Sequence, residues 1–454
     1  MEKKSSVAII GGGISGLSSA YWLKNNGFNI TLFEKEKQVG GSIITEKTDG
    51  FLVDYGPNST LETSEVLKEL ITEIGLTDQK IYGNEASNKR YIVKNGVLHE
   101  VPMKPPAFLT TKLFSLKAKL SLIREPFIKP TAGDDISLAD FVRHRLGQEF
   151  LDYAINPFVA GVYAGDPENL STAAAFPKLY ALEKKYGSLI KGAIKGARER
   201  KKRKEVAKDR AKLFSFIGGM EVFPQTLAKK IQPNILLNTE IKSIKKTVDG
   251  FELEYSVGNS KQNSKFDKIL FAVPSKSLAS MTKNLNSDYS IEFEKIYYPP
   301  VSVVFTGFRA SDIKRPLDGF GFLIPEVERR QILGSIWSST IFPNRAPEGY
   351  VAFTTFVGGT RQPENTVLQD SLLSKIVFDE LNDLVGLKNE PVFTRMKSWP
   401  SAIPQYNVGY SKIQEMFNNL EEEFPGLYIA GNIRKGISVG DSVLCAHEVV
   451  QKMT

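Results

Sequence analysis

Apolar and polar positions follow two different periods along this chain, and the change of period outlines its elements. A short β-branched run at residues 7–10 leads into a glycine-rich turn. After the turn, apolar residues recur at helical spacing from Leu17 to Leu23, and a second β-branched run follows at 29–33. The pattern predicts a strand, a tight turn, a helix and a second strand within the first forty residues.

Further along, the periodicity is first helical and then alternating. Over about 86–212 apolar residues fall three and four positions apart among lysines and an arginine, as at Phe108, Leu113, Phe114, Leu116, Leu120 and Ile123. Such amphipathic helices either bury their apolar side within their own protein or rest on a membrane surface, and both interpretations stay open. Over about 291–389, the runs at 301–308, 320–325 and 351–356 predict antiparallel strands.

The turn after the first strand contains Gly11, Gly13 and Gly16 in a G-x-G-x-x-G pattern. The first glycine permits a tight turn, the second lets the backbone approach a pyrophosphate, and the third lets the helix pack closely on the strand. Glu34 ends the second strand, where a carboxylate would accept a hydrogen bond from a ribose hydroxyl. The unit predicts dinucleotide binding, with FAD and NAD(P) both compatible.

Composition narrows the chemistry. Of the 454 residues, 41% are hydrophobic and 24% are charged, which is typical of a globular protein. One cysteine and three scattered histidines argue against a disulfide framework and against a metal centre, and they favour a reducing, cytoplasmic location. The sequence therefore predicts no metal and an organic cofactor. It shows neither a membrane-spanning apolar run nor a signal peptide.

The net charge of +8 is concentrated in one segment. Residues 191–212 hold 11 Lys and Arg against 3 Asp and Glu, so the rest of the chain is neutral in sum. A solvated helix or loop, an anionic membrane surface or an acidic partner would each explain this run. Nucleic acid is disfavoured, because the run lacks aromatic residues to stack on bases.

Motifs along the whole chain carry a resemblance to a known family. After Glu34 come a G-G pair at 40–41 and DYGPNS at 54–59. Later segments, in order, are KRYI at 89–92, EPF at 125–127, NPF at 156–158, GVYAGD at 161–166, SFIGGM at 215–220, SWP at 398–400, AGN at 430–432 and GISVGD at 436–441. The series resembles the protoporphyrinogen and coproporphyrinogen oxidases, a branch of the flavin amine oxidase superfamily. The resemblance implies FAD, bound non-covalently.

Matching positions imply the site residues. For the cofactor they are Gly11, Gly12, Gly13, Ile14, Ser15, Gly16, Glu34, Lys35, Gly41, Ser42, Gly56, Pro57, Asn58, Ser59, Ile241, Trp399, Gly431, Ile437, Ser438 and Val439. For the substrate they are Arg90, which would pair with a propionate, and Phe320, Gly321, Leu323 and Phe356 beside the tetrapyrrole. Asn58 is also the catalytic candidate, because its motif approaches the flavin ring.

The chain departs from the family pattern at a few positions. Many members have Arg or Trp after the G-G pair where this chain has Ser42, and many have Cys after the last G-D where it has Ser442. The C-terminal motif by which some amine oxidases tether FAD to a cysteine is absent. Cys445 is therefore expected to be a small buried helix residue.

The implied fold is α/β, with a Rossmann-type FAD-binding domain of the amine oxidase kind, a mixed-sheet substrate domain and a helical domain. The FAD domain is expected from three pieces, 1–85, 213–290 and 390–454. A helical domain that could associate with a membrane is expected from 86–212, and the substrate sheet from 291–389.

The resemblance implies oxidation of a porphyrinogen to a porphyrin in haem biosynthesis, removing six electrons and converting three molecules of dioxygen to hydrogen peroxide. Protoporphyrinogen IX is the favoured substrate and coproporphyrinogen III is the second choice. A flavin amine oxidase or desaturase, and a non-catalytic escort-type binding protein, also stay open. Peripheral contact with the cytoplasmic membrane and a homodimer are kept as hypotheses.

Overall fold

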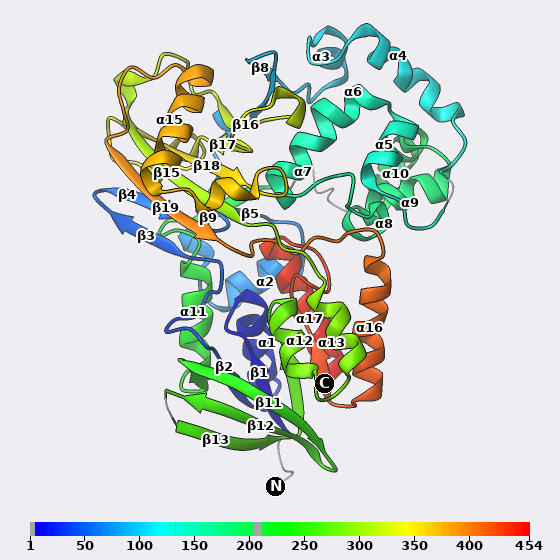
Figure 1. Cartoon of the computed structure of the whole chain (residues 1–454), viewed down its shortest axis with the longest axis vertical. Coiled ribbons are helices and arrows are strands. Elements are labelled where there is room, and N and C mark those ends of the chain that lie inside the picture. The colour runs from blue at the N-terminus through cyan, green and yellow to red at the C-terminus, as the bar shows by residue number, and fades with distance from the viewer. Residues whose placement is uncertain (1–4, 132, 204–210, 259) are drawn as a thin grey trace.

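Two large sheets and a group of helices build the molecule (Figure 1). The computed structural model describes residues 5–131, 133–203, 211–258 and 260–454, so residues 204–210 of the basic segment lie outside the described residues. In Figure 1 the first strands, the strands coloured green and the last helix share the lower lobe. The second sheet and the helical group form two upper lobes.

The lower lobe is organised around a parallel five-stranded sheet of order β10-β2-β1-β14-β20. Its strands are β1 (Ser6–Ile10), β2 (Asn29–Phe33), β10 (Ile235–Leu236), β14 (Lys268–Phe271) and β20 (Leu427–Ile429). Val7 to Ile10 are all buried. A parallel strand covered on both faces is apolar throughout, which explains the β-branched run in the sequence.

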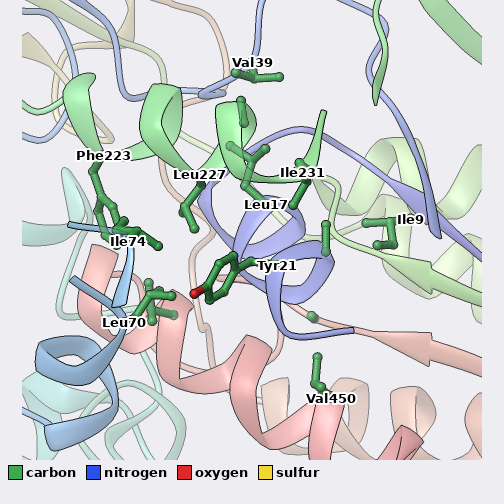
Figure 2. Packing of buried hydrophobic residues seen from close by; sticks show 14 of the residues in the cluster. Ile9, Leu17, Tyr21, Val39, Leu70, Ile74, Phe223, Leu227, Ile231 and Val450 are labelled. Atoms are coloured by element: carbon green, nitrogen blue, oxygen red, sulfur yellow. The ribbon is translucent and has the colours of Figure 1, made fainter. Parts of the chain in front are cut away.

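Helices cover one face of this sheet. They are α1 (Ile14–Asn25), α2 (Glu65–Glu73), α11 (Val222–Ile231) and α17 (Val439–Met453). Tyr21 of α1 lies among Leu227 of α11, Leu70 of α2 and Val450 of α17 (Figure 2). This core holds α1 against α17 and so places their N-termini at the same end of the sheet.

The opposite face is covered by an antiparallel three-stranded sheet and three helices. They are β11 (Thr239–Thr247), β12 (Gly250–Val257), β13 (Ser260–Phe266), α12 (Ser275–Thr282), α13 (Ser287–Glu294) and α16 (Tyr410–Glu423). Their buried residues share one cluster with Ala8 and Ile10 of β1 and Phe33 of β2.

One upper lobe contains a mixed sheet of order β19-β15-β18-β17-β16-β7-β8. The strands are β7 (Lys89–Lys94), β8 (Val97–Glu100), β15 (Val301–Arg309), β16 (Gly319–Leu323), β17 (Gly334–Ile336), β18 (Tyr350–Gly358) and β19 (Phe393–Trp399). Only the β16–β7 pair is parallel. One face packs on α15 (Asp370–Val385) through a core that includes Phe322 and Trp337.

The other face of this sheet looks toward the lower lobe and the helices. The hairpin of β3 (Thr45–Thr48) and β4 (Phe51–Asp54) packs there, with Phe51 stacked on Phe393 at a centroid distance of 4.4 Å. A small sheet of β5 (Thr60–Leu61), β9 (Leu213–Phe216) and β6 (Lys80–Tyr82) lies between the lobes. Short elements following β17 are α14 (Ser338–Ile341) and the 3-10 turn η8 (Pro343–Arg345).

The helical lobe contains short helices around one apolar core. They are α3 (Pro105–Thr110), α4 (Leu116–Arg124), α5 (Leu138–Arg145), α6 (Gln148–Phe150), α7 (Asn156–Tyr163), α8 (Thr172–Ala175), α9 (Pro177–Tyr186) and α10 (Leu189–Arg203). The apolar residues of the amphipathic pattern in the sequence fall into a buried group and an exposed group. Leu113 and Phe114 are buried in the core, whereas Leu116, Leu120 and Ile123 of α4 are exposed.

Strands cross the segment limits expected from the sequence. β7 and β8 fall within 86–212, yet they form one edge of the seven-stranded sheet, and β19, within 390–454, forms the other. The free backbone N–H and C=O groups of an edge strand can pair with a strand from any part of the chain. The strands of one sheet therefore need not be consecutive in the sequence. The expected domain limits stay a prediction.

Candidate active site

The glycine loop forms the predicted strand-to-helix turn. Gly11 donates from its backbone N–H to the carbonyl of Phe33, which joins the loop to β2. A Cβ at Gly16 would lie 1.9 Å from the carbonyl oxygen of Gly11, so α1 approaches the loop as closely as only glycine permits.

The N-terminus of α1 is built for an anion. Gly13 is its N-cap, no side chain caps it, and its first turn has no acidic residue. The first N–H groups of the helix are therefore left for a ligand, and the helix dipole favours a negative charge there. A Cβ at Gly13 would meet no atom within 4 Å, which leaves open space in front of the loop.

Three distant segments meet at this helix end. Gly40 donates from its N–H to the carbonyl of Gly12 at 2.9 Å. Ser15 donates from its hydroxyl to the carbonyl of Ser442 in α17 at 3.4 Å, and a Cβ at Gly431 would lie 3.6 Å from the Ser15 Oγ atom. The glycine loop, the G-G pair and the C-terminal motif thus surround one space, as a pyrophosphate site requires.

Glu34 and Ile241 extend this site along the sheet. The Glu34 carboxylate accepts from the N–H of Gly12 at 2.6 Å and from the N–H of Glu36 at 2.9 Å. Ile241 of β11 is buried in the cluster that contains Phe33. Lys35 is exposed and lies 3.8 Å from Glu36, so it contributes a surface charge rather than an enclosed contact.

The remaining predicted cofactor positions lie at the mouth of the lower lobe. A Cβ at Gly56 would lie 1.9 Å from the carbonyl oxygen of Ser42, so these two segments touch through their backbones. Trp399 donates from Nε1 to the carbonyl of Tyr55 at 2.8 Å. Ser438 caps α17 by accepting from the N–H of Asp441 at 3.1 Å, with Ile437 and Val439 on either side.

Taken together, these residues fit a dinucleotide. The uncapped helix end fits the phosphates, and the Glu34 carboxylate lies beside the glycine loop, where it can accept from a ribose hydroxyl. Cys445 is buried in α17, as the sequence predicts, and burial raises the pKa of its thiol.

A small pocket lies between the DYGPNS segment and the seven-stranded sheet. It brings together Asn58 and Ser59 from the cofactor set and Phe320 from the substrate set. The full lining is Leu52, Asp54, Asn58, Ser59, Phe305, Phe320, Ile336, Ser338, Ile341, Phe342, Arg345 and Thr354. Apolar walls with a few polar groups are typical of a site for an organic ligand.

Phe320 reaches this pocket because β16 carries a bulge. Gly321 and Leu323 pair with Ile336 and Gly334, so strand alternation would turn Phe320 to the opposite face. The β16–β7 register shifts between Gly319 and Phe322, and Gly321 has φ +138°. A bulge re-aims side chains in this way. A Cβ at Gly321 would lie 2.1 Å from the carbonyl oxygen of Ser335, so the bulge requires glycine.

Arg90 stands next to Phe320. Its guanidinium lies 5.4 Å from the centre of the Phe320 ring. Among the described residues it donates to the carbonyl of Asn88 at 3.4 Å, and no carboxylate of these residues lies within 4.0 Å of it. Desolvation lowers the pKa of Arg90, although the residue stays exposed. An arginine without a carboxylate partner at the rim of an apolar pocket can receive a carboxylate ligand.

Leu323 and Phe356 lie on the same face of the sheet but away from the pocket. A Cβ at Gly161 in α7 would lie 2.4 Å from the Leu323 Cδ2 atom. Phe356 packs on the cluster of Ala160, Ala164, Val301 and Leu333. The five predicted substrate positions thus form two groups, one at the pocket and one against α7.

Sequence reasoning missed Phe305, Ile336 and Thr354, which line the pocket from β15, β17 and β18. Strand alternation and pairing would have found them. Thr354 lies two residues from Phe356 on the same face of β18, and Phe305 and Ile336 both pair with Thr354. It also missed the buried pair of Asp54 and Arg345, whose Oδ2 and Nη2 atoms are 2.9 Å apart. No sequence pattern links two residues so distant in the chain.

The described residues contain no group of three or more His, Cys, Asp or Glu side chains arranged to hold a metal ion. In the same part of the chain, no helix is both long enough and apolar enough to cross a bilayer.

Comparisons with known proteins agree with this geometry. Residues 14–453 match the family described as flavin containing amine oxidoreductase. The chain is 34% identical to protoporphyrinogen oxidase 2 of Arabidopsis thaliana, over 96% of this chain and 91% of the relative. It is 31% identical to coproporphyrinogen III oxidase of Staphylococcus aureus, over 99% of both chains. A crystal structure from Exiguobacterium sp. 255-15 superposes with a TM-score of 0.82 at 24% identity, covering 99% of each chain, and so shares the fold.

Proposed function

Because the chain belongs to the flavin-containing amine oxidoreductases and is an FAD-dependent oxidoreductase, we propose that it oxidises a porphyrinogen to a porphyrin in haem biosynthesis. The observation that carries the proposal is the position of Arg90 and Phe320 beside the pocket that Asn58 and Ser59 line. This arrangement offers a cation and an aromatic face to a ligand that is apolar in its body and anionic at its edge. The oxidases from Arabidopsis and Staphylococcus support the substrate class.

Each pocket residue has a simple task in this reaction. A bound flavin accepts two electrons with a hydrogen from carbon and passes them to dioxygen, so a porphyrin requires three rounds. Arg90 would hold a propionate, and Phe320 would lie against the macrocycle. Phe305, Ile336 and Phe342 exclude water, and Asn58 orients the reacting edge from the cofactor side. We expect the FAD to be held without a covalent bond, and the burial of Cys445 inside the α17 core agrees with this expectation.

We favour protoporphyrinogen IX over coproporphyrinogen III because, in the described part of the chain, few cationic side chains near the pocket are free to pair with propionates. The first carries two propionates and the second four. Arg345, which lines the pocket, is engaged with Asp54. Arg90, beside Phe320, donates instead to the neutral carbonyl of Asn88 and is left to pair with a propionate.

The deciding experiment records the flavin spectrum of the purified protein and then porphyrin fluorescence after either porphyrinogen is added in air. We expect a yellow protein and faster fluorescence growth with protoporphyrinogen IX. Faster growth with coproporphyrinogen III would reverse the substrate choice. A flavin spectrum without turnover of either would favour an amine oxidase or desaturase, and a colourless protein would favour a binding protein.

Replacing Arg90 with alanine tests the assigned carboxylate contact. A hydrogen bond to a charged group contributes about 2 kcal/mol, so KM should rise about 30-fold while kcat and flavin content change little. The matched control is Lys89→Ala, because Lys89 is already paired with Asp318 at 2.6 Å and should affect KM less than about threefold. An unchanged KM in the Arg90 variant would remove this residue from the site.

We further propose that the tip of the helical lobe contacts an anionic membrane surface. Leu109, Leu116, Ile123 and Phe127 are each more than two thirds exposed and belong to α3, α4 and the turn after α4. Lys112, Lys117 and Arg124 lie among them in the sequence. Apolar side chains flanked by cations are suited to a headgroup region.

Sedimentation with lipid vesicles tests this contact. We expect binding to phosphatidylcholine vesicles that contain phosphatidylglycerol, and about tenfold weaker binding when Leu116, Leu120 and Ile123 are all replaced with glutamine. Val367→Gln, which replaces an exposed apolar residue in the sheet lobe, is the control. Binding that is unchanged by both the lipid charge and these substitutions would reject the contact.

Light scattering on the same preparation decides whether the protein is a homodimer.

A further inference from the structure

One buried carboxylate at the pocket has no task in the reaction described so far. Asp54 ends β4, is 1% exposed and lines the pocket with Asn58 and Phe320. Its Oδ1 atom accepts from the Thr45 hydroxyl at 2.6 Å and from the N–H of Met220 at 3.0 Å. These contacts hold Oδ1 in place and leave Oδ2 facing Arg345.

Oδ2 is buried and incompletely satisfied. It forms an ion pair with Nη2 of Arg345 at 2.9 Å and has no other partner among the described residues. Arg345 also donates from Nη2 to the hydroxyl of Ser215 at 2.6 Å and from Nη1 to Asn344 at 3.0 Å. A carboxylate oxygen held by one partner can still accept a further hydrogen bond, so a polar group in the pocket can reach it.

Burial sets the protonation behaviour of this carboxyl group. It raises the pKa of Asp54 above its ordinary value of 3.8, while the charge of Arg345 and the donors Thr45 and Met220 oppose that rise. Arg345 is the facing charge from η8. Glu221, in the turn before α11, does not contact Asp54 directly. It accepts from the backbone N–H of Thr45, the residue whose hydroxyl donates to Asp54. A carboxylate with a raised pKa is a stronger base than an ordinary one and so accepts a proton more readily.

The proposed reaction releases a proton that needs an acceptor. In each round one C–H bond of a bridging methylene breaks, and its hydrogen leaves with the electron pair to the flavin. One pyrrole N–H bond also breaks, and its electron pair stays to complete the new C=N bond. The N–H proton is left over. After three rounds, three bridging carbons have lost a hydrogen and three nitrogens have lost a proton, and a proton shift from the fourth bridging carbon to a nitrogen then completes the porphyrin. Dioxygen later takes up the two electrons with the hydrogen from carbon and one further proton, and hydrogen peroxide leaves.

We propose that Oδ2 of Asp54 accepts the pyrrole proton in each round, directly or through one water molecule, and that Arg345 holds the carboxylate ready for it. The inference rests on the proposed function, because it needs a substrate that loses a proton from nitrogen. It assigns Asp54 as a catalytic base and Arg345 as a positioning residue.

The test is Asp54→Asn in the full-length flavoprotein. The kcat for porphyrin formation should fall at least about 100-fold, the usual contribution of a general base. The wild-type kcat should decline as pH falls through the raised pKa of Asp54, because the protonated carboxyl group accepts nothing, and this acid limb should be missing in the variant. The infrared C=O band of a protonated carboxylic acid should titrate over the same pH range in the wild type and be absent from Asp54→Asn.

Two further variants distinguish a catalytic role of Asp54 from a purely structural one. Glu125→Gln removes another fully buried carboxylate, which lies 3.3 Å from Arg145 in the helical lobe, and it should lower stability without altering the pH profile. If Asp54→Asn fails to hold flavin, Asp54→Asn/Arg345→Met removes both charges, and it should fold yet still lack the acid limb. A variant that keeps the wild-type kcat and acid limb overturns the inference. A wild type that forms no porphyrin overturns the proposed function instead.

Discussion

Replacing Gly16 with alanine is expected to abolish flavin retention. The new Cβ would lie 1.9 Å from the carbonyl oxygen of Gly11, which is backbone and cannot swing aside. Helix α1 must therefore shift away from β1, and its N-terminus leaves the space that it shares with Gly431 and Ser442. Overpacking of this kind costs about 3 kcal/mol, which is about 100-fold if it falls on the binding of FAD.

The measurement is the ratio of flavin absorbance to protein after gel filtration, together with the thermal midpoint. Gly27→Ala is the control at the other end of the same helix, because Gly27 has φ +86° but no atom within 4 Å of a Cβ. That change should cost about 1 kcal/mol of stability and leave flavin content unchanged. A fully yellow Gly16→Ala protein would contradict the assignment of this loop.

Replacing Gly321 with alanine should impair turnover and spare the cofactor. Its φ of +138° disfavours any side chain, and the Cβ would lie 2.1 Å from the carbonyl oxygen of Ser335. The bulge would have to straighten, which turns Phe320 out of the pocket and takes away the ring beside Arg90. Strain and overpacking together should cost about 3 kcal/mol, and kcat/KM should fall about 100-fold.

Steady-state kinetics with flavin content as the internal reference measures this effect. Gly349→Ala is matched to it, because Gly349 also has a positive φ, +82°, but a Cβ there would meet nothing within 4 Å. That control should keep the wild-type kcat/KM. If Gly321→Ala keeps it as well, the bulge does not position Phe320 for the substrate.

The cofactor half of the site could be predicted from the sequence because its parts are local. The loop at Gly11 to Gly16 and the carboxylate of Glu34 belong to one strand-helix-strand unit, and a helix end determines its own anion site. The α/β fold, the FAD cofactor and the family were likewise predicted and are confirmed. The individual contacts of each cofactor residue stay predictions.

The substrate half of the site was harder to predict from the sequence because it depends on contacts between strands that are distant in the chain. Phe320 faces the pocket through a bulge opposite β7, and alternation alone would have turned it away. Asp54 and Arg345 meet across almost three hundred positions, and neither carries a sequence signal of the pairing. Leu116 and Leu113 show the same limit in the helical lobe, because the amphipathic pattern could not tell the exposed side chain from the buried one.

The order of strands in the parallel sheet has a consequence for how the protein is made. β1 and β2 emerge early from the ribosome, but β14 pairs with β1 only after residue 268, and β20 completes the sheet after residue 427. Until α17 arrives, the apolar side of α1 lacks one of its partners. Contacts of such sequence separation form slowly and leave apolar surface exposed meanwhile. Nascent chains should therefore depend on chaperones until α17 has been synthesised, and flavin uptake should follow the docking of α17 on α1.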